Sequence, residues 1–258
     1  MPETLMISID ERGVARLTLA RDDKHNAMSA EMIDELTEAA SMLGSDKRVR
    51  AIVLAGAGKS FCAGGDLEWM RAQFKASRAK RIAEARRLAM MFKALNEMPK
   101  PLIGCVHGSA FGGGIGLISV CDTVIASEAA RFGLTEVRLG LIPATISPYV
   151  VARIGASAAR SLFVSGRTFD AAYAKSIGLV ASVVAPAYLD RAVDKETDEF
   201  IAASPQAAAR AKALARSLAA PITDEIIDSV ISQLADSWET DEAQAGIAAF
   251  FEKRRPNS

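Results

Sequence analysis

The chain contains few of the residues that build disulfides or metal centres. Its 258 residues include two histidines and three cysteines, at Cys62, Cys105 and Cys121. Three is an odd number, and the spacing of these cysteines does not match a zinc site. We therefore expect reduced thiols, no bound metal and a cytoplasmic protein.

The chain also lacks a net charge and a long apolar run. Lysine plus arginine equals aspartate plus glutamate, at 31 each, so bulk charge does not indicate binding to nucleic acid. No stretch reaches the roughly 18 consecutive apolar residues of a membrane span. Residues 1–5 do not have the basic and apolar pattern of a signal peptide. We expect neither nucleic acid nor a membrane as a partner.

Half of the residues are hydrophobic, which is enough for one large core. Alternating apolar residues over 5–10 and 14–19 predict a β-hairpin. Ser29 is a suitable N-cap for a helix over residues 30–43, which we expect Gly44 to end.

Apolar runs and amphipathic segments then alternate. A long basic helix is expected over residues 75–98, with its lysines and arginines forming a solvated face. From about residue 196 the chain is predicted to be helical, with more apolar residues than a lone surface helix needs, so we expect it to pack on another subunit. Further strands are expected over residues 49–55, 102–106, 123–126 and 179–184.

Two glycine-rich loops, residues 56–65 and 108–116, carry the strongest functional signal. A phosphate-binding loop is excluded because Val53 stands where the first glycine of that motif belongs. The dinucleotide motif fails in both possible registers, because Ala110 or Leu117 occupies a glycine position.

Each of these loops follows an apolar run that we expect to be a strand. Glycines leave the backbone bare, so its N–H groups can face a ligand. Two such loops that converge can each give one N–H to a single oxygen and so form an oxyanion hole, in which each donor is worth about 100- to 1,000-fold in rate. The alternative is two ordinary tight turns.

Four motifs in order resemble those of the crotonase (enoyl-CoA hydratase/isomerase) superfamily. They are Phe-Cys-Ala-Gly-Gly-Asp-Leu at 61–67, Gly-x-Ala-x-Gly-Gly-Gly at 108–114, Cys-Asp at 121–122 and Arg-Phe-Gly-x-x-Glu at 131–136. The resemblance runs through most of the chain and includes the terminal residues 251–254. Residues 21–27 and 141–149 are most similar to bacterial methylglutaconyl-CoA hydratases.

The resemblance implies an α/β fold, the crotonase spiral of repeated ββα units. It places this spiral core, with an acyl-CoA site, at residues 1–195 and a C-terminal helical trimerisation region at residues 196–258. Trimers of this family often pair, so a homotrimer or a hexamer is expected.

The resemblance also implies where an acyl-CoA substrate binds. The backbone N–H groups of Gly65 and Gly113 would hold the thioester oxygen. Coenzyme A would lie along residues 24–26 and 63–67 as part of the substrate, with no separate cofactor. Lys24 suits a phosphate, although it equally suits a surface turn without a ligand. The residues expected to contact substrate are Lys24, His25, Ala63, Gly64, Asp66, Leu67, Ser109 and Gly112.

A thioester held in this way accepts negative charge, and a carboxylate must then move a proton beside it. Glu136 lies in a largely apolar stretch, and the resemblance places it at the catalytic position. The alternative is a surface ion pair with Arg131 or Arg138. Typical hydratases of this superfamily carry a second glutamate where this chain has Gly116.

A single carboxylate leaves three functions open. The first is an enoyl-CoA hydratase for a short branched acyl group, such as a methylglutaconyl type, in which Glu136 orients water and delivers the proton. The second is an enoyl-CoA δ-isomerase with Glu136 as the single acid and base. The third is a weakly active acyl-CoA-binding relative, for which Glu136 should be exposed and paired with arginine.

Other polar residues are expected to be structural. His107 ends a predicted strand and should pack there. Thr145, Ser147 and Tyr149 should cap their loop, or else hydrogen-bond a polar acyl group or water.

Overall fold

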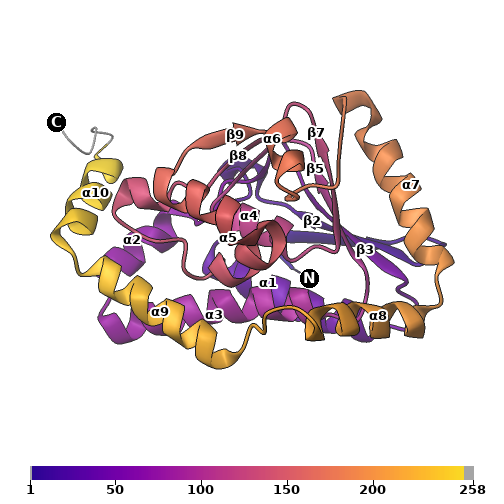
Figure 1. Cartoon of the computed structure of the whole chain (residues 1–258), viewed down its shortest axis with the longest axis horizontal. Coiled ribbons are helices and arrows are strands. Elements are labelled where there is room, and N and C mark those ends of the chain that lie inside the picture. The colour runs from indigo at the N-terminus through magenta and orange to yellow at the C-terminus, as the bar shows by residue number, and fades with distance from the viewer. Residues whose placement is uncertain (1, 253–258) are drawn as a thin grey trace.

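A computed structural model describes residues 2–252, in which strands form two sheets and helices surround them (Figure 1). Of the terminal stretch 251–254 that the resemblance includes, residues 253–254 lie outside the described part. The strands are Leu5–Ile9 (β1), Val14–Leu19 (β2), Ala51–Gly56 (β3), Ser60–Cys62 (β4), Leu102–Val106 (β5), Ser109–Phe111 (β6), Thr123–Ser127 (β7), Arg131–Gly133 (β8), Thr168–Asp170 (β9) and Ser182–Val184 (β10).

The helices account for most of the remaining chain. The α-helices are Ala30–Ser45 (α1), Leu67–Lys75 (α2), Arg78–Glu97 (α3), Gly113–Ser119 (α4), Ser147–Ser165 (α5), Ala171–Ser176 (α6), Leu189–Ala202 (α7), Pro205–Ser217 (α8), Asp224–Trp238 (α9) and Asp241–Phe251 (α10). Short 3₁₀ turns are Asp22–Lys24 (η1), Glu136–Leu139 (η2) and Pro186–Tyr188 (η3). Across the described part of the chain, no helix combines the length and apolar character needed to cross a membrane.

The two sheets are linked by a repeating path. The larger sheet has the order β1-β2-β3-β5-β7-β10, and the smaller has the order β4-β6-β8-β9. Three times in succession, a strand of the larger sheet is followed by a strand of the smaller sheet and then by a helix: β3-β4-α2, β5-β6-α4 and β7-β8-η2-α5. This path confirms the predicted spiral of ββα units. The predicted hairpin is also confirmed, because β1 and β2 pair antiparallel.

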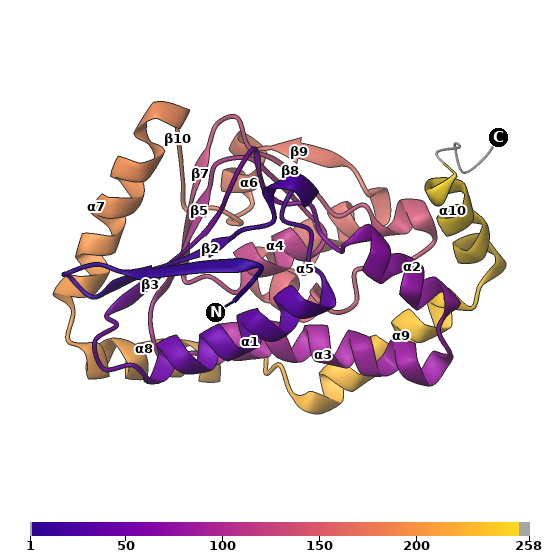
Figure 2. The ribbon, with the colours of Figure 1, turned by 180° about the vertical axis from the view of Figure 1, so that it is seen from behind.

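The central strands β3, β5 and β7 of the larger sheet are buried on both faces, which explains their continuous apolar runs. Ile52 and Leu54 belong to the main core, which lies toward α1 and α3. Val53, between them, points the opposite way and packs with Leu189 and Val193 of α7. Seen from behind, α7 lies along one side of this sheet while α1 and α3 lie below it (Figure 2).

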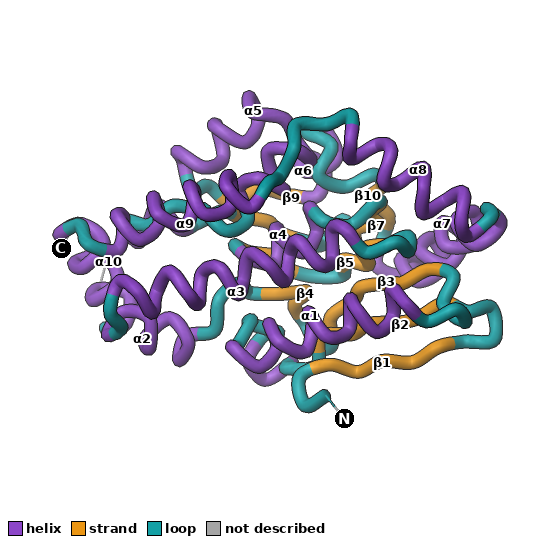
Figure 3. Tube along the Cα trace, turned by 90° about the horizontal axis from the view of Figure 1, so that it is seen from below, coloured by secondary structure: helices purple, strands orange, loops and turns teal. Residues whose placement is uncertain are grey.

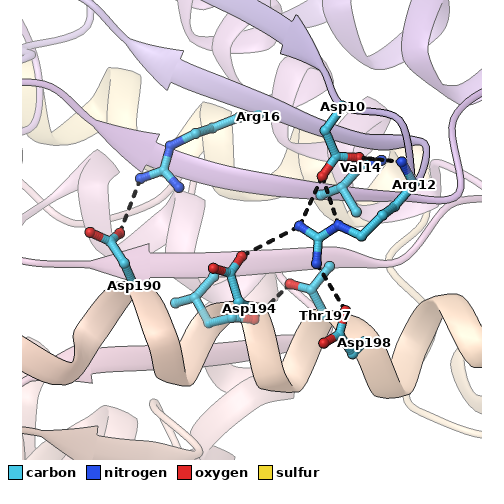
Figure 4. Close-up of polar contacts among 9 residues, drawn as sticks. Asp10, Arg12, Val14, Arg16, Asp190, Asp194, Thr197 and Asp198 are labelled. Atoms are coloured by element: carbon cyan, nitrogen blue, oxygen red, sulfur yellow. Dashed lines mark hydrogen bonds and ion pairs between the residues drawn. The ribbon is translucent and has the colours of Figure 1, made fainter.

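Ion pairs hold α7 in register on the hairpin (Figure 4). Three aspartates spaced one turn apart, Asp190, Asp194 and Asp198, face Arg12 and Arg16. Arg12 Nη1 lies 2.9 Å from Asp198, and Arg16 Nη2 lies 3.5 Å from Asp190. These side chains are exposed, so each pair contributes about 1 kcal/mol at most. Apolar burial therefore anchors α7, and the ion pairs fix where it sits.

Three predicted boundaries are wrong. Helix α1 continues through Gly44 and ends at Ser45. The helix expected over residues 75–98 is α3 but begins later, at Arg78, because Ser77 caps it with a side-chain bond to the Lys80 N–H. The last helical part begins earlier than residue 196, since α7 starts at Leu189. The division of the chain into core and trimerisation region stays a prediction.

The basic face of α3 is also different from the prediction. Seen from below, α3 lies between α1 and α9 (Figure 3), and it contacts both. Instead of facing solvent alone, three of its cations bind carboxylates of α9 or of Glu239, which follows α9. The pairs are Arg78 with Asp236 and Glu239, Arg86 with Asp224 and Asp228, and Lys93 with Asp224.

Candidate active site

The smaller sheet brings three segments together at one edge. Strands β4, β6 and β8 run parallel and lie next to one another. Gly65 follows β4, the pair Gly112 and Gly113 follows β6, and Glu136 follows β8. In sheets with parallel strands, ligands bind beyond the carboxyl ends of the strands. The candidate site lies at such an edge.

The two predicted oxyanion donors have backbone N–H groups free for a ligand. The Met28 N–H donates to the Gly64 carbonyl at 2.8 Å, and the Asp66 N–H donates to the Met28 carbonyl at 3.0 Å. The Gly65 N–H, between these two bonds, takes part in neither. Gly113 is the first residue of α4, where an N–H has no partner within the helix. Neither N–H has an acceptor among residues 2–252.

The loops come so close that side chains would separate them. A Cβ on Gly112 would lie 3.0 Å from Glu136 Oε1, and the φ of 48° and ψ of −115° at Gly112 suit glycine. A Cβ on Gly64 would lie 3.1 Å from the Phe111 carbonyl oxygen. Glycine at these positions therefore sets the distance between the two loops and the carboxyl group.

One oxygen of the Glu136 carboxyl group, Oε2, is buried without a protein partner among the described residues. Burial raises the pKa of Glu136 to about 7. The alternative of an ion pair with arginine is wrong for both candidates, since Arg131 donates to backbone carbonyls and Arg138 makes no ion pair with it within the described chain. The pKa near neutrality suits a group that both takes up and releases a proton.

Gly65, Gly113 and Glu136 line one cavity of about 130 Å³. Its wall is mostly apolar and includes Trp69 and Ile146. Glu136 is the one carboxylate that lines it within the described chain. Helix α10 supports the turn that carries Glu136, because Ala243 packs closely against Gly140. No group of three or more His, Cys, Asp or Glu side chains in residues 2–252 is placed to hold a metal ion.

The position of the usual second glutamate is filled with hydrocarbon. Gly116 lies on the buried part of α4, and a Cβ there would overlap Ile146 and lie 2.8 Å from the ring of Phe92. There is no space for a longer side chain without repacking both neighbours. The site is therefore built around a single carboxylate.

The residues predicted to bind coenzyme A lie around the first loop. Lys24, His25, Ala63 and Leu67 are exposed, and the Ala63 N–H donates to the His25 carbonyl over 3.0 Å. Ser109 lies in β6, beside Ser60. The placement leaves Lys24, His25, Ala63 and Leu67 accessible to a large ligand, and their contact with coenzyme A stays a prediction.

Asp66 has a structural role as well. Its carboxylate caps α2 by accepting from the Glu68 and Trp69 N–H groups, and it pairs with Arg21 at 3.0 Å. Burial tends to raise its pKa, but the bond from the Trp69 N–H and the Arg21 guanidinium hold the pKa of Asp66 below its ordinary value. Its side chain is thus already occupied, and a direct contact with substrate stays a prediction.

Of the other polar residues, Thr145 lines the cavity. Ser147 Oγ donates to the Ala144 carbonyl at 2.8 Å, and Tyr149 donates to the Ala89 carbonyl at 3.3 Å. Ser147 therefore caps its loop as expected, whereas Tyr149 bonds α3 instead of its own loop. His107 is half-buried at its strand end, with Nε2 3.0 Å from the Gly58 carbonyl oxygen.

Sequence reasoning missed three residues that line the cavity, Met28, Gln73 and Arg81. Asn26, in the range 24–26 predicted to lie along coenzyme A, is fully buried and fixes the turn before Met28 by bonding Arg21, Ala57 and Ser60 backbone groups. The positive φ of 54° at Asn26 is typical of a short polar turn.

Free N–H groups beside a buried carboxyl group suit an enzyme that polarises a carbonyl group and moves a proton beside it. Comparisons with known proteins specify the class further. A family model for enoyl-CoA hydratase/isomerase matches residues 10–258. A Thermus thermophilus relative, a putative enoyl-CoA hydratase by name, is 33% identical over 253 residues, which make up 97% of this chain and 99% of that protein.

Solved structures agree. An enoyl-CoA hydratase from Shewanella pealeana is 38% identical, with a TM-score of 0.82 over 100% of this chain and 97% of that chain. An enoyl-CoA hydratase from Mycobacterium avium is 31% identical, with a TM-score of 0.85 over 100% and 99%. The chain belongs to the enoyl-CoA hydratase/isomerase family and is an enzyme of that family with the crotonase fold.

Proposed function

We propose that this chain is an enoyl-CoA hydratase that acts on a short branched acyl-CoA, such as a methylglutaconyl type. The observation that carries the proposal is the buried, unpaired Glu136 carboxyl group beside the free N–H groups of Gly65 and Gly113. The hydratase names of the solved relatives support the same reaction.

The thioester oxygen would accept two hydrogen bonds, from Gly65 and Gly113. These bonds stabilise the negative charge that the oxygen gains when the α,β double bond is attacked. They act more strongly as charge builds up than on the resting substrate, so they lower the barrier rather than only tighten binding.

Ionised Glu136 would take one proton from a water molecule while the water oxygen bonds to the β-carbon. The double-bond electrons move onto the thioester oxygen as an enolate. Protonated Glu136 then gives its proton to the α-carbon, and the carboxylate is restored. The net change is one water added, and the reverse sequence removes it.

A second candidate is enoyl-CoA δ-isomerisation. The packed position of Gly116 favours it, because a single carboxylate can carry a proton between the α- and γ-carbons without holding a water. The third alternative, a weakly active acyl-CoA binder, required an exposed Glu136 paired with arginine. The buried carboxyl group argues against it.

Replacing Glu136 by glutamine tests the proposal. Glu136→Gln keeps the shape and removes the base, so turnover of crotonyl-CoA should fall about 100- to 10,000-fold, while butyryl-CoA, which cannot react, should bind with nearly unchanged affinity. Steady-state kinetics and titration calorimetry measure the two effects. Glu128→Gln changes an exposed glutamate nearby and serves as the control. Undiminished turnover in Glu136→Gln would mean that another group moves the proton.

A further inference from the structure

The cavity that holds Glu136 contains a second polar centre, formed by Arg81 of α3 and Gln73 of α2. Both residues line the cavity together with Gly65 and Gly113. Arg81 Nη1 and Gln73 Oε1 are fully buried, and neither has a hydrogen-bond partner among the described residues. Buried polar atoms are nearly always paired in folded proteins, so two orphans in one cavity indicate an absent partner.

The rest of the Arg81 guanidinium group is held firmly. Its Nε donates to the Gln73 carbonyl at 3.2 Å and its Nη2 donates to the Ala76 carbonyl at 2.9 Å. Its Cζ lies 5.7 Å from the ring centre of Trp238, at the end of α9. These contacts fix the orientation of Arg81 and leave the Nη1 donors to the cavity.

No carboxylate of the described chain neutralises Arg81. Its helix neighbours Arg78, Arg86 and Arg87 each form ion pairs, and Arg81 forms none within 4.0 Å. Glu84, one turn away, is already bonded to the Trp69 indole N–H and to Arg87. Arg81 as a whole is half-buried, but its Nη1 donors are out of water without a partner in the described chain, which is costly. A ligand anion would remove this cost.

A carboxylate is the anion that best fits this centre. Guanidinium donors in a planar fork match the two oxygens of a carboxylate. Gln73 can present an N–H instead of Oε1 by turning its amide, because the two ends have nearly the same shape. The opposite charge of Glu136 does not compensate Arg81, since the two groups form no ion pair.

The cavity size limits the acyl group. A cavity of about 150 Å³ accepts a benzene molecule, so a cavity of about 130 Å³ suits about six non-hydrogen atoms beyond the thioester carbonyl group, which is the number in a glutaryl chain. A chain that starts at the Gly65 and Gly113 N–H groups and passes Glu136 would reach Arg81 while still short.

We infer that Arg81, assisted by Gln73, binds a carboxylate at the far end of the acyl chain. The preferred substrates are then CoA thioesters of short dicarboxylic acids. This inference rests on the proposed function, because it takes the thioester end to lie at Gly65 and Gly113. It adds Arg81 and Gln73 as the residues that select the group at the far end of the acyl chain.

A matched pair of unreactive ligands tests the inference by binding alone. Glutaryl-CoA and valeryl-CoA have acyl chains of equal length and differ in a terminal carboxylate or methyl group. Titration calorimetry on the wild-type protein should show glutaryl-CoA bound at least about 10-fold more tightly. Arg81→Met should remove or reverse that preference by weakening glutaryl-CoA about 30-fold or more, with little change for valeryl-CoA. Arg87→Met, further along α3 and bound to Asp34, should leave the preference intact.

The outcomes separate the inference from the proposed function. Equal binding of both ligands by the wild type, or equal weakening of both by Arg81→Met, would overturn the inference while leaving hydration possible. A clear preference for glutaryl-CoA without turnover of any enoyl-CoA would support the inference and contradict the hydratase. If Arg81→Met does not fold, Arg81→Lys keeps the charge without the fork and should weaken glutaryl-CoA alone. Uniform weakening by the lysine variant would count against the assignment.

Discussion

For single residues, the burial of Glu136 suits the proposed proton transfer and costs stability. Its Oε2 is buried without a partner, and burial raises its pKa to about 7. A carboxyl group in this position is close to half-ionised at neutral pH, as a group that alternately accepts and donates a proton needs to be. The same burial makes ionisation unfavourable for the fold.

This conflict predicts a pH-dependent gain in stability for Glu136→Gln. The pKa is about 4.5 in the unfolded chain and about 7 in the folded protein. Below pH 4.5 both states are protonated and the group has no effect. Between pH 4.5 and 7 the unfolded state ionises first, so the wild type loses stability as pH rises. Glu136→Gln should therefore be more stable than the wild type, as measured by the free energy of unfolding. This gain should be about 2–3 kcal/mol larger at pH 8 than at pH 5.

Chemical denaturation at the two pH values measures this difference, with Glu128→Gln as the exposed control. A gain of the same size at both pH values would show that the Glu136 pKa is not raised in the folded protein.

At the scale of elements, the site depends on glycines that let three strand ends meet. The φ of 48° at Gly112 and its approach to Glu136 exclude a side chain without strain. Helix α5 contains a useful comparison at Gly155, where φ is 74° and an added Cβ would meet no atom within 4 Å. Both positions have backbone conformations that are unfavourable for alanine, but only Gly112 lies against the Glu136 carboxyl group.

Gly112→Ala should therefore damage both stability and turnover, whereas Gly155→Ala should damage stability alone. Each variant carries backbone strain of about 1–3 kcal/mol. In Gly112→Ala the added methyl group also displaces Glu136, and a shift of about 1 Å can reduce turnover about 100-fold. Thermal unfolding and crotonyl-CoA kinetics measure the two effects. Similar turnover in both variants would mean that Gly112 does not position Glu136.

The sequence predicts the elements around the site better than the walls of its cavity. The hairpin, the Ser29 cap and the glycine loops follow from local patterns, and the structure contains all three. The break between α2 and α3 depends on a cap at Ser77 that the basic periodicity obscured. Arg81 looked like one more surface cation. Its orientation is fixed by the Gln73 and Ala76 carbonyls and by Trp238, far along the chain, and no periodicity in the sequence reports such contacts.

At the scale of the whole molecule, the C-terminal helices find much of their apolar contact within the chain. Trp238 and Ile247 pack with Leu141 beside the active-site turn. The number of apolar residues in this region predicts a contact with another subunit, and packing within the chain accounts for part of them. Helix α8 differs, because Leu214 and Leu218, one turn apart, are 60% and 80% exposed. Exposed leucines on one helix face indicate a contact between proteins.

We expect a homotrimer or a hexamer in solution, with α8 in the contact between subunits. Light scattering should give a mass of about three or six times the 27.3 kDa of one chain. Leu218→Glu should shift the mass toward the monomer, whereas Met6→Glu, at an exposed position of β1, should not. A monomeric wild type would contradict the assembly, and an unchanged mass in Leu218→Glu would remove α8 from it.

The central claim is that one carboxylate, Glu136, suffices for hydration. The most direct measurement is the reaction of the wild type with crotonyl-CoA and 3-methylglutaconyl-CoA in heavy-oxygen water, with products identified by mass spectrometry. We predict a 3-hydroxyacyl-CoA that carries one heavy oxygen, and Glu136→Gln should form it at least about 100-fold more slowly. A 3-enoyl-CoA is tested in the same water. If its double bond migrates without uptake of heavy oxygen, and neither of the other two substrates is hydrated, the enzyme is an isomerase and Glu136 does not support hydration.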